Sequence, residues 1–156
     1  MSVQIKFAYE NLDEVRALFT EYQVNIGLDL CFQSFDEELE TLPGNYALPF
    51  GRLYIATLSN EIAGCIALRP VDKQCCEMKR LYVREQFRGF GIGRTLSEKI
   101  IGDAKKIGYK KMVLDTLTSM QKAVSLYKSL GFMEIEPYYN NPNHDVVFLG
   151  LDIRTV

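Results

Sequence analysis

The sequence contains no tryptophan and one histidine, and its four cysteines are not spaced for metal binding. Cys31, Cys65, Cys75 and Cys76 lack the paired two-residue spacing of a zinc site, and His144 stands alone. We therefore expect no metal in this protein. Cys75 and Cys76 are adjacent in a predicted strand, so we interpret them as small apolar side chains that point to opposite faces of a sheet.

The sequence also lacks a long apolar run and an excess of positive charge. No stretch of about 18 uninterrupted apolar residues is present, and residues 1–6 reach polar and charged side chains too early for a signal peptide. The formal net charge is −2, whereas proteins that bind nucleic acid or anionic membranes gain from a strong positive excess. We expect a cytoplasmic protein with no nucleic-acid partner and no membrane partner.

The composition is that of an ordinary soluble domain, with 47% hydrophobic and 24% charged residues. A chain of 156 residues buries roughly two-thirds of the surface that its unfolded form exposes, which is enough for a core without metals or disulfides. No repeat, low-complexity tract or linker divides it. These features predict a single domain over residues 1–156.

Apolar periodicity predicts a continuous series of strands and helices. Possible capping boxes at Asn11 with Glu14 and at Ser34 with Glu37 begin two helices, and Ser119 is predicted to cap a later one. Strands are predicted over residues 3–8, 52–58, 61–68, 75–83, 111–116, 132–136 and 145–152, and the longest helix over 91–107. The order βααβββαβαββ predicts an α/β (α+β) fold, with a mixed sheet and helices on both of its faces.

The segment 88–95, which reads RGFGIGRT, lies between a predicted strand and an amphipathic helix. The first backbone N–H groups of a helix have no internal partner, and the helix dipole adds positive potential there, so a phosphate group is stabilised at this end. Glycines at positions 89, 91 and 93 permit positive φ angles and a close approach of the backbone. Arg88 and Arg94 add positive charge, so the segment predicts a phosphate-binding loop.

Two other phosphate-binding motifs do not fit this loop. A Walker-type loop requires a lysine before its serine or threonine, and Arg94 precedes Thr95 instead. A dinucleotide fingerprint would need glycine at position 94 or 96, which are Arg94 and Leu96. A glycine-rich turn that binds nothing remains the alternative.

Three segments together resemble the GCN5-related N-acetyltransferase superfamily. Residues 88–93 are similar to its R-x-x-G-x-G pyrophosphate signature, residues 77–83 (EMKRLYV) to the strand before that loop, and residues 123–132 (AVSLYKSLGF) to its later helix-and-strand motif. The resemblance covers most of residues 52–136. Met120 departs from the family, many of whose members have asparagine three residues before the alanine of the second motif.

The resemblance implies a mostly antiparallel sheet whose fourth and fifth strands splay apart, with acetyl-coenzyme A (acetyl-CoA) in the gap. The backbone of Leu81, Tyr82 and Val83 would then pair with the pantetheine arm. The residues implied to hold the pyrophosphate are Arg88, Gly89, Phe90, Gly91, Ile92, Gly93, Arg94 and Thr95.

The implied reaction requires an uncharged amine. An amine with a pKa near 10.4 is protonated at neutral pH, and removing its proton there costs about 3.4 pK units, or roughly 4.6 kcal/mol. Glu77 is the predicted base, acting directly or through a water, with a solvated strand glutamate as the alternative. Tyr127 is predicted to donate to the departing sulfur, and a packing role is its alternative.

We expect the acceptor to be a primary amine of a small molecule, which attacks the thioester directly in a ternary complex. A protein lysine or N-terminus is an alternative acceptor, and a non-catalytic module that binds acyl-CoA is an alternative function. The acidic run 36–40 and the polar, aromatic segment 138–144 are candidates for the acceptor site, although a solvated helix face and a long turn explain them equally well. The resemblance also implies that two copies can pair through the final strands.

Overall fold

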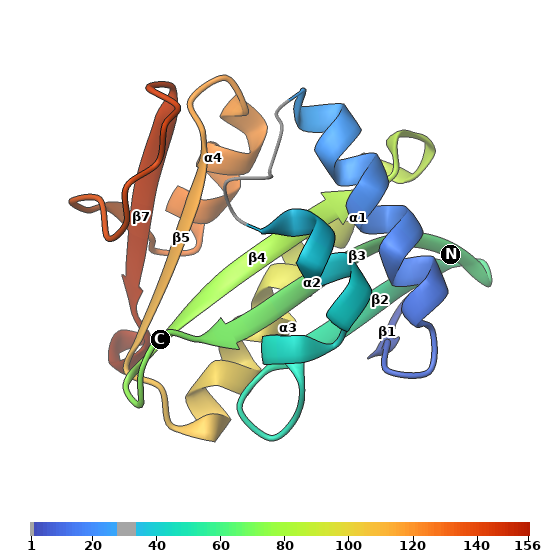
Figure 1. The fold of residues 1–156 in the computed structure, drawn as a ribbon, viewed down its shortest axis with the longest axis horizontal. Helices are drawn as coiled ribbons and strands as arrows, with labels where there is room; N and C mark the ends of the chain where they lie inside the picture. Colours follow the sequence, from blue (N-terminus) through green and yellow to red (C-terminus); the bar gives the residue numbers. More distant parts are fainter. Residues whose placement is uncertain (1, 28–33) are drawn as a thin grey trace.

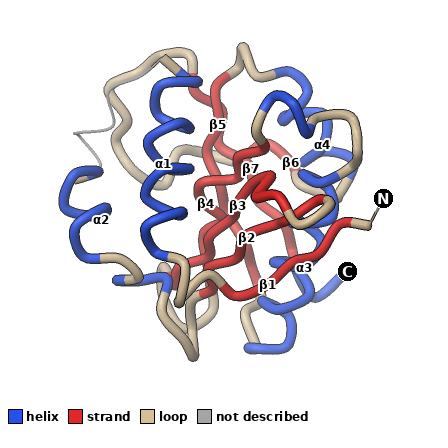
Figure 2. The backbone as a smooth tube through the Cα atoms, turned by 90° about the vertical axis from the view of Figure 1, so that its right-hand side faces the viewer, coloured by secondary structure: helices blue, strands red, loops and turns tan. Residues whose placement is uncertain are grey.

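The computed structural model describes residues 2–27 and 34–156, which form a seven-stranded sheet with helices against both faces (Figures 1 and 2). The strands are β1 (Val3–Phe7), β2 (Arg52–Leu58), β3 (Glu61–Pro70), β4 (Cys75–Val83), β5 (Lys111–Leu117), β6 (Met133–Glu134) and β7 (Val146–Asp152). Their order in the sheet is β1-β2-β3-β4-β5-β7-β6. Every neighbouring pair is antiparallel except β4 and β5, which are parallel. The predicted mixed, mostly antiparallel sheet is confirmed.

The helices divide between the two faces of the sheet. Helices α1 (Leu12–Ile26) and α2 (Phe35–Thr41) cover one face, and α3 (Ile92–Ile107) and α4 (Gln121–Ser129) lie on the opposite face (Figure 2). The predicted order of strands and helices is confirmed. Within residues 2–27 and 34–156, no helix is long and apolar enough to cross a membrane.

The central strands are buried on both faces, because each contributes alternate side chains to two separate cores. On β2, Tyr54 and Ala56 pack in the core beneath α3, whereas Leu53 and Ile55 pack in the core beneath α1. Both faces of the sheet are therefore buried at its centre.

The helix starts are correctly located, but their predicted caps are not formed. Asn11 and Ser34 directly precede α1 and α2, yet neither side chain makes a capping hydrogen bond. Ser34 has a φ of 58°, a left-handed conformation, whereas a capping residue normally has an extended backbone. Met120 rather than Ser119 precedes α4, so the prediction of a serine cap there was wrong.

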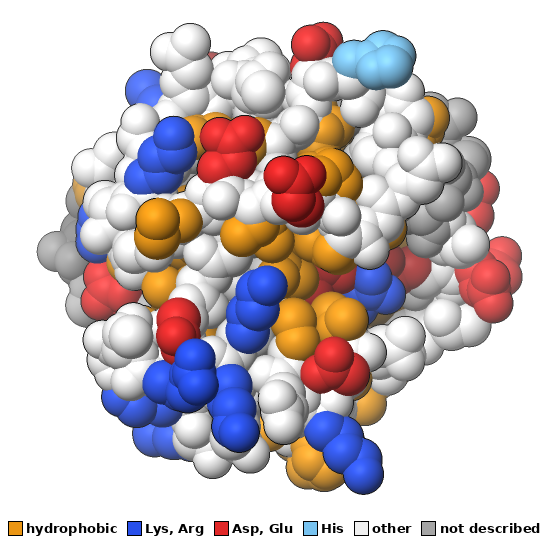
Figure 3. All heavy atoms as spheres, turned by 90° about the vertical axis from the view of Figure 1, so that its left-hand side faces the viewer, with side chains coloured by type: hydrophobic (Ala, Val, Ile, Leu, Met, Phe, Trp, Pro, Cys, Tyr) orange, Lys and Arg blue, Asp and Glu red, His pale blue; other side chains and the backbone are white. Residues whose placement is uncertain are grey.

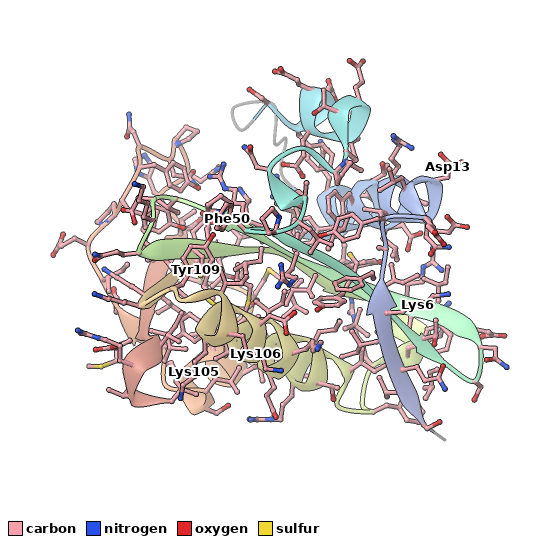
Figure 4. The ribbon with its side chains drawn as sticks, turned by 90° about the horizontal axis from the view of Figure 1, so that it is seen from below. Lys6, Asp13, Phe50, Lys105, Lys106 and Tyr109 are labelled. Atoms are coloured by element: carbon pink, nitrogen blue, oxygen red, sulfur yellow. The ribbon has the colours of Figure 1, made fainter. Side chains whose placement is uncertain are left out.

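The C-terminal end of α3 is fixed to the rest of the domain (Figure 4). Gly108 ends the helix with a φ of 111°, and Lys105 and Lys106 in its last turn complement the negative end of the helix dipole. The Tyr109 hydroxyl then donates a hydrogen bond of 2.9 Å to the carbonyl oxygen of Phe50. This contact fixes the far end of the helix whose N-terminus borders the cavity described next.

Strands β4 and β5 pair over only three residues before they separate. The last pair joins Glu77 to Val113. On the other side of β4, the pairing with β3 shifts register next to Arg80, which has a φ of 61°. The shift is a β-bulge, which bends a strand locally. It lies in the part of β4 that runs beyond the pairing with β5, and the predicted splay is confirmed.

Candidate active site

A cavity of about 700 Å³ lies where β4 and β5 separate. Its walls come from five parts of the chain: the end of α1, residues 78–83 of β4, most of residues 87–94 in the loop and first turn of α3, residues 114–116 of β5, and most of residues 119–127 in α4 and the turn before it. One continuous space therefore joins the glycine loop to the forked strands.

The glycine loop forms the start of α3 as predicted. Gly91 is the capping residue, with a φ of 75° and no side-chain cap, so the first N–H groups of α3 lack an internal partner. A Cβ atom added to Gly91 would meet nothing within 4 Å. Glycine is therefore needed here for its backbone conformation, because an L-residue with a side chain is strained at this φ.

Nine of the eleven residues predicted to contact the cofactor line the cavity; Phe90 and Thr95 do not. The Phe90 side chain is 48% exposed, and the Thr95 hydroxyl donates to the carbonyl oxygen of Gly91 at 2.9 Å. The lining residues are Leu81, Tyr82, Val83, Arg88, Gly89, Gly91, Ile92, Gly93 and Arg94. Both arginines of the loop are exposed, where they can reach a phosphate group.

Tyr127 lies on α4 and lines the same cavity, although it is only 7% exposed. Its ring makes an edge contact with Phe132, with the centroids 5.8 Å apart. Burial, together with the nearby charge of Asp115, raises the pKa of the Tyr127 hydroxyl above its ordinary value of 10. The hydroxyl therefore remains a proton donor across the neutral range.

Glu77 is buried and engaged at both carboxylate oxygens. Its side chain is 1% exposed; one oxygen accepts from Arg69 at 2.7 Å and the other from the Tyr138 hydroxyl at 2.6 Å. The cavity lining does not include Glu77. The solvated alternative was wrong, and any catalytic action must pass through a group between the carboxylate and the cavity.

Arg80, at the bulge in β4, is a buried charge that sequence reasoning did not single out. Its guanidinium donates to both oxygens of Glu38 at 3.0 Å and lies over the ring of Phe35, 5.2 Å from the centroid. This bidentate pair connects α2 to the fork of the sheet. Glu38 therefore has a structural partner, while the other acidic residues of the run are exposed.

Sequence reasoning also missed a polar cluster around Asp115. This residue lies on β5, is partly buried and lines the cavity. Its carboxylate accepts hydrogen bonds from the Tyr139 hydroxyl and, at 3.4 Å, from the amide nitrogen of Asn141. The signal in the sequence that could have identified Asp115 was a single carboxylate within an otherwise apolar part of a strand. Adjacent Tyr138 and Tyr139 thus bond to β4 and β5 respectively, across the fork between these strands.

Two further titratable residues differ in their relation to the cavity. Lys79 lines the cavity, and burial lowers its pKa to about 8. His144, the pale blue residue in Figure 3, is exposed on the surface. Among the residues that the structure describes, no group of three or more histidine, cysteine or acidic side chains is arranged to hold a metal ion.

A helix start opened by glycine, a parallel strand pair that forks and a buried tyrosine that lines the gap are the features expected of an acyl-CoA-dependent transferase. Residues 12–132 match the acetyltransferase (GNAT) family. The chain belongs to this family and is an N-acetyltransferase.

Individual relatives agree with this assignment. The chain is 44% identical to an uncharacterized N-acetyltransferase of Schizosaccharomyces pombe, over 92% of this chain and 90% of the relative. A GNAT acetyltransferase from Elizabethkingia anophelis, solved with acetyl-CoA bound, is 33% identical with a TM-score of 0.57, over 65% of this chain and 76% of that one. An acetyltransferase from Streptococcus agalactiae shares the fold, with a TM-score of 0.79 over 96% and 98% of the two chains at 23% identity.

Proposed function

We propose that this protein transfers the acetyl group of acetyl-CoA to the primary amine of a small molecule, by direct attack within a ternary complex. The observation that carries the proposal is the single cavity bordered both by the open helix start at Gly91 and by Tyr127. An anion-binding end and a proton donor in one space are what a thioester donor with a diphosphate requires.

The residues of the cavity would hold two parts of acetyl-CoA, its pyrophosphate and its pantetheine arm. The free N–H groups at the start of α3, with Arg88 and Arg94, would hold the pyrophosphate. Residues 81–83, at the end of β4 beyond its pairing with β5, would bond to the pantetheine arm through their backbone. Met120 lines the cavity where many relatives have asparagine, so it would contact the arm through its thioether and methylene groups.

The proposed reaction balances in atoms and charge. An alkylammonium first loses one proton, and its nitrogen lone pair then attacks the carbonyl carbon of the thioester. As the C–S bond breaks, the sulfur takes a proton from Tyr127, and the nitrogen loses a second proton, which restores the tyrosine. Each turnover therefore yields the amide, the free thiol of coenzyme A and one released proton.

Glu77 is the proposed acceptor of the first proton, with the Tyr138 hydroxyl as the connecting group. That hydroxyl already donates to Glu77 at 2.6 Å, so it can pass its own proton to the carboxylate as it receives one from the amine. A water molecule could serve the same purpose. Arg69 holds the other carboxylate oxygen at 2.7 Å and fixes the orientation of Glu77.

The proposal is tested by incubating the protein with acetyl-CoA and a panel of primary amines, following release of the thiol. Turnover with at least one small amine is the expected result, and it should fall in a Tyr127→Phe variant that still binds acetyl-CoA. Mass spectrometry of a mixture of proteins after the same incubation tests the alternative of a protein acceptor. Binding of acetyl-CoA without turnover on amines or proteins would instead favour a regulatory module.

A further inference from the structure

Asp115 occupies a distinctive position at the fork of the sheet. It lies on β5 two residues beyond Val113, the last residue that pairs with β4. Residues separated by two along a strand point to the same face, so the Asp115 side chain is on the face of Val113. The cavity that contains Tyr127 includes Asp115 in its wall. A carboxylate is thus present at the forked end of the proposed acetyl-CoA site.

The partners of Asp115 differ from those of the other buried acids nearby. Glu77 and Glu38 each form an ion pair with an arginine. The hydrogen bonds that Asp115 accepts in the described part of the chain come from neutral groups, the Tyr139 hydroxyl and the Asn141 amide. Neutral donors fix the orientation of the carboxylate without neutralising it. The charge of Lys79, which lines the same cavity, also acts on Asp115, but burial lowers the pKa of Lys79 to about 8 and so weakens its hold on the proton. An entering ammonium group therefore competes with Lys79 for this carboxylate.

The charge of Asp115 also reaches the hydroxyl groups around the cavity. It contributes to the raised pKa values of Tyr22, Tyr127 and Tyr138, in each case after the larger effect of burial. These tyrosines come from α1, α4 and the segment before β7. Asp115 therefore lies within electrostatic range of the predicted acid Tyr127 and of Tyr138, the partner of the predicted base.

We propose that Asp115 binds the ammonium group of the acceptor and holds its nitrogen at the fork, so that the protein favours acceptors that enter as cations. The assignment rests on the proposed acetyl transfer to an amine. Tyr139 is a positioning residue, since it acts through the carboxylate that it orients. Asp115 binds the substrate, while the net proton leaves through Tyr138 and Glu77, so the two carboxylates have different roles.

The test compares two acceptors of the same chain length with wild-type and Asp115→Asn protein. One is a primary alkylamine, which is a cation at neutral pH, and the other is the corresponding alkoxyamine, which is uncharged there. Loss of a charge-assisted hydrogen bond should raise the KM of the alkylamine about 10- to 100-fold in the variant. The KM values of the alkoxyamine and of acetyl-CoA should change little. Asp13→Asn removes an exposed carboxylate from the first turn of α1, outside the cavity lining, and is the matched control.

Several outcomes would overturn the assignment. A fall in kcat with an unchanged KM of the alkylamine would make Asp115 a base and not a binding group. Equal losses on both acceptors, or the same loss in Asp13→Asn, would show that the charge of Asp115 does not select the cation. If Asp115→Asn fails to fold, Tyr139→Phe keeps the charge and should raise the same KM by a smaller factor. The alkylamine is chosen from the amines that the wild-type protein acetylates, and wild-type protein inactive on every amine of that panel would overturn the proposed function itself.

Discussion

Replacing Gly91 with alanine separates the role of the loop conformation from the stability of the fold. Gly91 has a φ of 75°, and a Cβ atom there would meet nothing within 4 Å, so the substitution adds backbone strain without a clash. A left-handed conformation costs an L-residue about 1–2 kcal/mol. At about 2–4 °C per kcal/mol for a domain of this size, Tm should fall by about 2–8 °C.

The same substitution should weaken acetyl-CoA binding much more than a global loss of stability can. If alanine shifts the loop out of its left-handed conformation, the N–H groups at the start of α3 no longer converge on the pyrophosphate. Loss of one charge-assisted hydrogen bond, about 1.5–3 kcal/mol, would raise Kd about 10- to 100-fold. Isothermal titration calorimetry measures this value, with Tm recorded on the same samples.

Gly108→Ala is the matched control. Gly108 ends α3 with a φ of 111°, and a Cβ atom there would also meet nothing within 4 Å. Gly108→Ala should lose at least as much stability as Gly91→Ala, because a φ of 111° lies further outside the left-handed region open to L-residues, while it binds acetyl-CoA like the wild type. If Gly91→Ala lowers Tm but leaves the Kd for acetyl-CoA unchanged, the proposed role of the loop in binding the pyrophosphate is refuted.

Three further predictions concern other parts of the molecule. Tyr127→Phe should lower kcat by about ten- to a thousandfold in steady-state assays while the Kd for acetyl-CoA is retained; unchanged turnover would remove the hydroxyl from the mechanism. Burial lowers the pKa of Lys79 from 10.5 to about 8. Between these pH values the unfolded chain binds more protons than the folded protein does, so the free energy of unfolding should increase from pH 8 to 10.5. Denaturation of Lys79→Met should show a smaller increase. Gly64→Ala should cost about 3 kcal/mol or abolish folding, because its Cβ would lie 2.3 Å from the carbonyl oxygen of Tyr82; wild-type Tm would contradict this.

Features encoded by neighbouring residues were predictable from the sequence. The predicted strands 52–58 and 61–68 leave only Ser59 and Asn60 between them, and both residues adopt the positive φ values that a two-residue hairpin turn requires. The glycine loop and the start of α3 were identified for a similar reason, since a strand, three alternating glycines and an apolar helical stripe follow one another directly. Local conformation and periodicity contain enough information for these elements.

Contacts between distant segments were not predictable in the same way. The hydrogen bond from Tyr138 to Glu77 joins residues 61 apart, and the pair of Arg80 with Glu38 joins residues 42 apart. The register of β4, its bulge and the path of the chain before β7 decide these contacts, and a single sequence specifies none of them locally. Hence Glu77 was recognised as a candidate but its burial was not, and Asp115 was overlooked.

The central claim is that the start of α3 binds the diphosphate of acetyl-CoA, and titration calorimetry with two donors tests it most directly. S-acetylpantetheine carries the same thioester and arm but lacks the pyrophosphate and the nucleotide. Acetyl-CoA should bind the folded wild-type protein far more tightly than S-acetylpantetheine, and Gly91→Ala should remove much of this difference. Equal affinity for the two donors, or no detectable binding of acetyl-CoA, would contradict the claim.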